Sequence, residues 1–211
     1  MDNWINTYKT EYKDLLNRRS SGLKRGLRND IYDRSEGYQI IFENLLSAKE
    51  SNFQIIETGT VRNPMNWKDG NSGFLFAELV KRHGGFVRSV DIDQSAVDTA
   101  NNFVDSRYYK SNCSDSVSWL ESLSDLSDVD LFYLDSYDVE WTNDTPSAEH
   151  HLKEFQVIEK YLKPGCIVAI DDNSRLLLSG KRTGKGRMIV EYLESKEIYP
   201  IYDAYQIIYK F

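Results

Sequence analysis

From residue 53 onward, short apolar runs alternate with segments whose apolar residues recur at helical spacing. Five of the runs predict strands: "FQIIE", "GFVRSVDID", "SRYYKSN", "VDLFYLD" and "CIVAIDD". The segments between them, such as "SGFLFAELVKRHG" and "SAEHHLKEFQVIEKYL", predict amphipathic helices. Strands that alternate with helices of this length are joined by crossover connections, which make neighbouring strands parallel. The alternation therefore predicts an α/β fold whose parallel sheet is covered by helices on both faces.

The end of the chain departs from this alternation. After the helical segment "GRMIVEYLESK", two strand-like runs, "IYPIY" and "YQIIYKF", are separated only by Asp203 and Ala204. So short a connection predicts an antiparallel hairpin. A parallel sheet closed by such a hairpin resembles the class I S-adenosylmethionine-dependent methyltransferase fold. That resemblance implies a Rossmann-like, doubly wound, mostly parallel seven-stranded sheet.

The first fifty residues have a different pattern. Apolar residues at spacings of three and four, from Trp4 to Leu16, predict one amphipathic helix, and "GYQIIFENLLSAKE" predicts a second. We therefore divide the chain into a helical extension over residues 1–50 and a main domain over residues 51–211. The extension is expected to cover the acceptor or to contact a second subunit in a homodimer.

Charge and composition exclude several classes of partner. The chain of 211 residues carries a net charge of −7, which disfavours general binding to nucleic acid or to an anionic membrane. We find neither an apolar run long enough to span a bilayer nor the features of a signal peptide, so we expect a cytoplasmic protein. Its two cysteines, Cys113 and Cys166, are too few for a disulfide framework and are expected to be reduced.

Acidic side chains follow four of the five predicted parallel strands, at residues 57–59, 91–93, 135–138 and 171–173. Open parallel sheets bind ligands outside the carboxyl ends of their strands. Asp and Asn are also common in loops and at helix N-caps, which would explain one or two of these positions. Four on one edge favour a binding site.

The residues at these strand ends suit an adenosine that carries an amino-acid tail. Gly59 lets a ligand approach the backbone, and Glu57 offers an acceptor for an ammonium group. Asp91 can accept hydrogen bonds from both hydroxyls of a ribose. Ser114 and Asp115, at the start of a predicted helix, can read an adenine edge.

Two phosphate-binding motifs do not fit the chain. A dinucleotide fingerprint requires glycines where Val61 and Pro64 stand. A P-loop requires four residues between its glycines, whereas "GKRTGKG" has three, and its Lys185 is followed by Gly186. A pyrophosphate is therefore not the expected ligand.

Five motifs between residue 53 and about residue 175 carry a more specific resemblance: "IIETGT", "SVDID", "NCSDS", "LFYLDSYD" and "YLKPGCIVAIDDN". Their order and spacing are similar to those of the metal-dependent O-methyltransferases, both the catechol O-methyltransferase type and the macrocin-type sugar O-methyltransferases. The resemblance implies S-adenosylmethionine as cofactor and a divalent cation, usually Mg²⁺, held by Asp135, Asp172 and Asn173. Such a cation would orient the acceptor hydroxyl and lower its pKa, which gives Asp135 a catalytic role.

The general base is where the chain departs from that family. Catechol O-methyltransferase has a lysine three residues after its metal-binding acid, and this chain has Asp138. The motif "AEHHLKEF" offers His150 and His151 instead, and helical spacing turns His151 inward. Histidine is a suitable base near neutral pH, so His151 is the candidate, with a purely structural histidine as the alternative.

Basic residues gather in an apparent insertion and in two further runs. The insertion "VRNPMNWKDG" holds Arg62, Trp67 and Lys68, which would contact the methionine carboxylate, cover the acceptor or simply pack on the surface. The run "SGKRTGKGR" brings three glycines and the cations Lys181, Arg182, Lys185 and Arg187, which indicates a mobile loop and an anionic acceptor. The other run, "RRSSGLKRGLR", spans residues 18–28.

These features predict a Mg²⁺-dependent O-methyltransferase that acts on a hydroxyl of a small molecule such as a sugar or natural product. Two alternatives stay open: an RNA or protein methyltransferase with the same cofactor site, and a non-catalytic nucleotide-binding module of the same fold.

Overall fold

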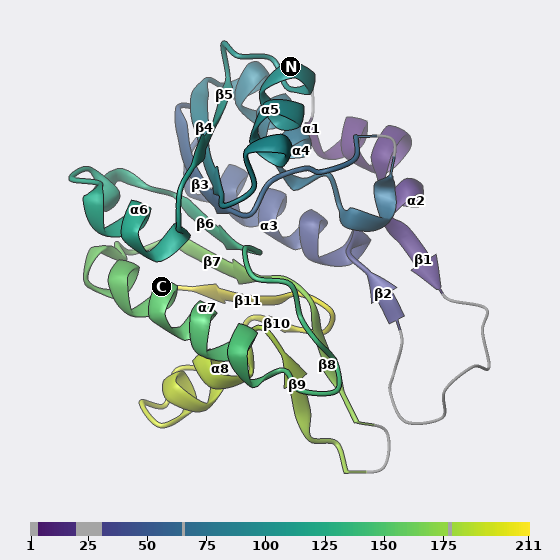
Figure 1. Ribbon diagram of the computed structural model, residues 1–211. Helices are drawn as coiled ribbons and strands as arrows, with labels where there is room; N and C mark the ends of the chain where they lie inside the picture. Colours follow the sequence, from purple (N-terminus) through teal and green to yellow (C-terminus); the bar gives the residue numbers. More distant parts are fainter. Residues whose placement is uncertain (1–3, 20–30, 65, 177–178) are drawn as a thin grey trace.

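A computed structural model describes residues 4–19, 31–64, 66–176 and 179–211 and contains one large twisted sheet between two layers of helices (Figure 1). The seven strands lie in the order β10-β11-β7-β6-β3-β4-β5. Five are parallel: β3 (Phe53–Thr58), β4 (Gly85–Asp91), β5 (Tyr109–Cys113), β6 (Leu131–Leu134) and β7 (Ile167–Ile170). The hairpin of β10 (Tyr202–Asp203) and β11 (Ile207–Lys210) adds an antiparallel edge. The predicted mostly parallel seven-stranded sheet is confirmed.

Each face of the sheet packs against its own group of helices, because alternate residues of a strand point to opposite faces. Ile55 of β3 joins the apolar cluster formed with α3 (Ser35–Ala48), α4 (Ser72–His83) and α5 (Gln94–Phe103). The adjacent residue, Ile56, joins the cluster formed with α6 (Ser116–Ser122), α7 (Thr145–Ile158) and α8 (Arg187–Glu194). The strands are buried on both faces, as their continuous apolar runs predict.

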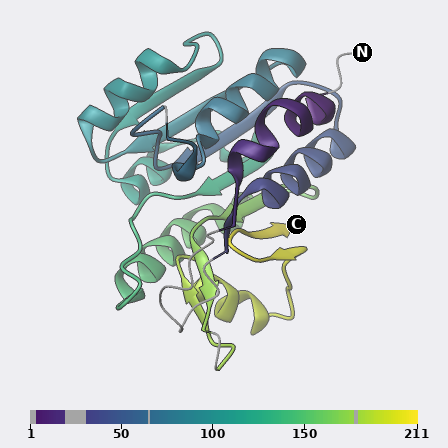
Figure 2. The same cartoon turned by 90° about the vertical axis from the view of Figure 1, so that its right-hand side faces the viewer.

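The amino-terminal extension packs into the first of these clusters. Its first helix is continuous over α1 (Trp4–Thr7), the π-helical turn η1 (Tyr8–Tyr12) and α2 (Lys13–Leu16), and it lies beside α3 (Figure 2). The rings of Trp4 and Tyr8 are completely buried, with centroids 5.2 and 5.1 Å from that of Phe42 in α3. These two aromatic residues are therefore used within the chain and are not available to a second subunit.

Two short hairpins were not predicted. In the extension, β1 (Asn17–Arg19) pairs with β2 (Ile31–Asp33), and most of the basic run 18–28 lies outside the described residues. Beyond the carboxyl end of β7, β8 (Asn173–Arg175) pairs with β9 (Arg182–Gly184). β1, β8 and β9 are polar and β2 is only three residues long, so their sequences carry no period-two apolar pattern that would predict strands.

Short 3₁₀ turns complete the main domain: η2 (Trp67–Asp69), η3 (Leu126–Asp128) and η4 (Glu159–Tyr161). Both cysteines are free, with Cys113 exposed and Cys166 buried. Among the described helices, none has the length and apolar character needed to cross a membrane.

Candidate functional site

A cleft with two cavities lies at the carboxyl ends of the parallel strands, where an open sheet of this kind binds ligands. The narrow cavity, of about 30 Å³, is lined by residues from the ends of β3 and β6 and from the insertion, among them Gly59, Arg62, Ser72 and Asp135. The wide cavity, of about 200 Å³, lies between the ends of β4 and β5 and the start of α7. Asp91 lines both.

The Asp91 carboxylate is held in place by backbone donors. Its Oδ1 accepts a hydrogen bond from the N–H of Asp93 at 2.9 Å, and its Oδ2 accepts one from the N–H of Thr60 at 3.2 Å. Burial raises the pKa of Asp91 above its ordinary value. In a nucleoside with a tail, the ribose lies between the base and the tail. A carboxylate between a wide and a narrow cavity is therefore well placed to accept hydrogen bonds from the ribose hydroxyls.

The wide cavity has the polar edge predicted from "NCSDS" and two apolar walls that were not predicted. Ser114 and Asp115 line it, and the Asp115 carboxylate also accepts the N–H of Ser118 at 2.9 Å as the N-cap of α6. The side walls include Ile92 and Tyr137, which are 77% and 49% exposed. An apolar residue one or two positions after a strand-end acid, as Ile92 follows Asp91 and Tyr137 follows Asp135, is the sequence signal that would have identified both.

Glu57 is close to the narrow cavity but does not line it. Its side chain is buried and accepts hydrogen bonds from the hydroxyls of Ser72 and, at 3.4 Å, Tyr109. Burial raises the pKa of Glu57 to about 7. Ser72 lines the cavity. Glu57 therefore contacts a residue that lines the cavity, and its predicted contact with an ammonium group stays a prediction.

Gly59 lines the narrow cavity, and the protein itself also requires a glycine there. Its φ is +84°, a region that side chains disfavour. A Cβ at this position would lie 2.5 Å from the carbonyl oxygen of Asp135. The glycine lets the ends of β3 and β6 come together, which brings Asp135 to the cavity.

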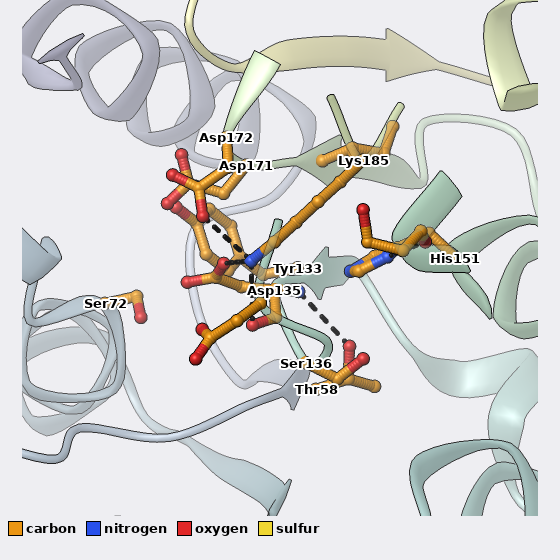
Figure 3. A network of polar contacts seen from close by, with 12 residues as sticks. Thr58, Ser72, Tyr133, Asp135, Ser136, His151, Asp171, Asp172 and Lys185 are labelled. Atoms are coloured by element: carbon orange, nitrogen blue, oxygen red, sulfur yellow. Dashed lines mark hydrogen bonds and ion pairs between the residues drawn. The ribbon is translucent and has the colours of Figure 1, made fainter. Parts of the chain in front are cut away.

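Three buried or half-buried carboxylates, Asp135, Asp171 and Asp172, form what we call the acidic cluster (Figure 3). The Lys185 ammonium group donates to Asp135 Oδ1 and lies 2.9 Å from Asp172 Oδ2. The Arg34 guanidinium contacts Asp171 Oδ2 at 2.6 Å and Asp172 Oδ1 at 3.0 Å. Arg34 was not predicted to be part of the site, and Lys185 was predicted to contact an anionic acceptor instead of these carboxylates.

The glycines beside Lys185 explain how it reaches the acidic cluster. Gly184 has a φ of +105°, and a Cβ there would overlap the carbonyl oxygen of Asp172. A Cβ at Gly186 would lie 2.8 Å from Asn173 Oδ1. Both glycines are buried, so the prediction of a mobile loop is wrong for this part of the run: these glycines allow close packing.

The predicted Mg²⁺ site does not fit these residues. The Asn173 side chain is fully engaged, because its Oδ1 accepts the N–H of Gly186 at 2.7 Å and its Nδ2 donates to backbone carbonyls, including that of Ile170 at 2.9 Å. Asp135 and Asp172 share the ammonium of Lys185 between them. In the described part of the chain, no group of three or more His, Cys, Asp or Glu side chains is arranged to hold a metal ion. The Asn173 amide therefore holds the backbone together and is not free to bind a metal ion.

His151 points inward, as predicted, but is completely enclosed. Its Nδ1 lies 2.7 Å from the carbonyl oxygen of Ser147, and its Nε2 has no hydrogen-bond partner among the described residues. Burial lowers its pKa to about 4, so the ring is neutral at pH 7. It lines neither cavity of the cleft, whereas His150 lines the wide one and lies 2.8 Å from the Ser116 hydroxyl.

The insertion crosses the edge of the cleft. Arg62, which lines the narrow cavity, makes a two-point ion pair with Asp138, with distances of 2.7 and 3.0 Å. Trp67 stacks on Tyr12 of the extension, with ring centroids 5.7 Å apart. The side chain of Lys68 lies outside the described residues.

Three of the four cations in the run 179–187 have carboxylate partners within the protein. Arg182 pairs with Asp203, Lys185 with the acidic cluster, and Arg187 with Asp144 at 3.3 Å. This run therefore gives less support than the sequence suggested to an anionic acceptor.

The strand order, the antiparallel last strand and the cleft at the carboxyl edge define a Rossmann-like methyltransferase fold. Among solved structures, the chain is similar to apo CalS11, a TDP-rhamnose 3'-O-methyltransferase of calicheamicin biosynthesis. The TM-score is 0.53 at 15% identity, covering 83% of this chain and 77% of CalS11.

Two further similar structures are methyltransferases. MycE of mycinamycin biosynthesis, solved with Mg and SAH, has a TM-score of 0.44 at 15% identity; the match covers 68% of this chain but 32% of MycE. The 1,6-didemethyltoxoflavin-N1-methyltransferase of Burkholderia thailandensis has a TM-score of 0.44 at 11% identity, covering 81% of this chain and 76% of that one. No protein-family model and no curated protein matches the chain. At these identities the likeness establishes the fold.

Proposed function

We propose that this protein is an S-adenosylmethionine-dependent O-methyltransferase that transfers a methyl group to a hydroxyl of a small molecule such as a sugar or natural product. The observation that carries the proposal is the position of Asp91 at the end of β4, where it lines both cavities of the cleft. An adenosine with an amino-acid tail requires an acceptor for its ribose hydroxyls between two such spaces.

The residues of the cleft suit the parts of that cofactor. The wide cavity offers the Tyr137 ring and Ile92 to the faces of an adenine, and the Ser114–Ser116 segment to its polar edge. The narrow cavity offers Ser72 and Arg62 to the amino-acid tail. When bound, S-adenosylmethionine supplies an electrophilic methyl group, so the chain has to position a nucleophilic oxygen and take up its proton.

Asp135 is the side chain best placed to take that proton. It follows β6, lines the narrow cavity and has a side chain that is 20% exposed, whereas His151 is enclosed. Burial and the charges of Asp171 and Asp172 raise the pKa of Asp135, against the opposing charge of Lys185. A carboxylate with a raised pKa is a better general base near neutral pH than an ordinary one. The proton of the acceptor hydroxyl would pass to Asp135 as the oxygen forms a bond to the methyl carbon and the sulfur–methyl bond breaks, which would leave S-adenosylhomocysteine as the product.

Isothermal titration with S-adenosylmethionine tests the cofactor site. Asp91→Asn keeps the shape of the side chain and removes its charge, and should weaken binding by about 10-fold to 100-fold, since hydrogen bonds to charged groups contribute about 1.5–3 kcal/mol. Asp98→Asn, an exposed change on α5, is the matched control and should bind as the wild type does. If the wild type does not bind the cofactor, the methyltransferase proposal is wrong and a non-catalytic module of the same fold is favoured.

Formation of S-adenosylhomocysteine with different acceptors tests the reaction. TDP-rhamnose and catechol represent hydroxyl acceptors, and a short single-stranded RNA represents the alternative. Turnover with either small molecule that falls in Asp135→Asn, while cofactor binding is kept, supports the proposal. Turnover with RNA alone contradicts the small-molecule acceptor.

A further inference from the structure

The acidic cluster is balanced in large part by two cationic side chains of the same chain. Its three carboxylates face two cations, Lys185 and Arg34. The Lys185 side chain is 1% exposed, so its charge is enclosed with the carboxylates and is not accessible at the protein surface. Burial lowers the pKa of Lys185, but the charges of Asp135 and Asp172 raise it by more, so the ammonium form persists across the physiological range.

Three oxygen atoms surround the Lys185 ammonium group. They are Asp135 Oδ1, the Asp135 carbonyl oxygen at 3.3 Å and Asp172 Oδ2 at 2.9 Å. An ammonium group has three N–H donors, so these contacts use all of them. Figure 3 shows Lys185 reaching from its own segment into the space between the two carboxylates.

The same three oxygens are the type of donor that Mg²⁺ and Mn²⁺ prefer. The position between two carboxylates and a carbonyl is therefore a cation position, and the ammonium group is the cation in it. The Tyr205 hydroxyl also donates to Asp172 Oδ1, which leaves Oδ2 turned toward the ammonium.

We propose that Lys185 is a built-in replacement for a divalent cation, so that the wild-type protein binds no Mg²⁺ or Mn²⁺ at the acidic cluster and its methyl transfer is independent of metal. The absence of metal binding is inferred from the acidic cluster alone, whereas the metal independence of methyl transfer rests on the proposed function. Because all three donors are committed, Lys185 does not hold the acceptor as a metal would. It is a positioning residue that holds Asp135.

The proposal predicts that removing the ammonium group creates a metal site. Lys185→Ala leaves the three oxygens without a cation in contact with them, and Arg34 stays paired with Asp171 and Asp172. A divalent ion supplies the missing charge and accepts the same oxygens as ligands. The truncated side chain also frees space for the water molecules that complete the coordination shell.

Mn²⁺ binding, followed by electron paramagnetic resonance on the full chain without cofactor or acceptor, tests the proposal. The wild type and Lys181→Ala, an exposed lysine near the same hairpin, should show no saturable binding up to about 1 mM. Lys185→Ala should bind one Mn²⁺ per chain at least ~10-fold more tightly than the wild type, and the ion should raise its melting temperature. Lys185→Ala/Asp172→Ala should lose this binding.

Two results on Mn²⁺ binding would overturn the proposal that Lys185 replaces a divalent cation. One is stoichiometric Mn²⁺ binding by the wild type that Asp172→Asn weakens. This measurement does not depend on whether a variant without Lys185 folds. The other is a folded Lys185→Ala protein that binds no Mn²⁺. A failure of the methyltransferase proposal is distinguishable from both, because it would be seen as absent S-adenosylmethionine binding with the Mn²⁺ results unchanged. If turnover is found, EDTA should leave its rate unaltered, and loss of turnover in EDTA contradicts the metal-independent reaction.

Discussion

The buried carboxyl of Glu57 should make the stability of the protein depend on pH between about 4.5 and 7. Its ordinary pKa of 4.5 is raised to about 7 in the folded chain because burial disfavours the charged form. Below pH 4.5 the group is protonated in both states, and its contribution to stability is fully present. As the pH rises, the unfolded chain ionises first, so this contribution is lost progressively until about pH 7.

The size of the effect follows from the two pKa values. Each pKa unit corresponds to about 1.4 kcal/mol, so the interval from 4.5 to about 7 amounts to about 3 kcal/mol. Glu57→Gln removes the titration and keeps an oxygen for the Ser72 hydroxyl and a polar atom for Tyr109. The free energy of unfolding of this variant, relative to the wild type, should therefore increase by about 3 kcal/mol between pH 4.5 and pH 7.5.

Urea unfolding followed by tryptophan fluorescence at several pH values measures this difference. Glu149→Gln, an exposed change on α7, is the control, and its difference from the wild type should not vary by more than about 0.5 kcal/mol. A Glu57→Gln difference that is flat across this pH range would refute the reasoning, because it would mean that Glu57 titrates alike in the folded and unfolded chain.

Two further predictions concern packing. Gly184→Ala, whose Cβ would overlap the carbonyl of Asp172, should lower the free energy of unfolding by about 2–4 kcal/mol, whereas Gly180→Ala, which shares a positive φ but faces open space, should cost about 1 kcal/mol. Equal costs would show that the overlap relaxes. Trp4→Ala should cost about 3–5 kcal/mol in the same urea assay, against less than about 1 kcal/mol for the 41% exposed Leu15→Ala, and a small Trp4 effect would show that the extension is not part of the core.

The main sheet and its order of elements were predictable because they depend on hydrophobic periodicity, which is local in the sequence. The run "FQIIE" is apolar on both faces because β3 lies in the centre of the sheet, and Asp91 was identified because it follows such a strand. The position of a strand-end residue follows from the topology alone, since the carboxyl ends of parallel strands share one edge.

What could not be predicted depends on contacts between distant segments. Nothing near Lys185 in the sequence shows that its partners are Asp135 and Asp172, so a basic run with three glycines was interpreted as a mobile anion-binding loop. In the sequence, glycines beside a buried lysine cannot be distinguished from glycines in a mobile loop. They differ in whether another backbone passes within contact distance, and only the folded structure shows this for Gly184 and Asp172.

The residues of the cleft and the cations of the acidic cluster are synthesised at different times. The cleft that holds Asp91 uses residues 59–150, but the Arg34–Asp171 contact joins residues 137 positions apart and the Lys185–Asp135 contact joins residues 50 apart. During synthesis from the amino terminus, the residues of the cleft leave the ribosome first, whereas Asp135 stays without its ammonium partner until residue 185 has emerged. The acidic cluster is therefore a contact that the protein completes late, and a chain truncated before β9 would keep the cleft residues but lack the cation that holds Asp135.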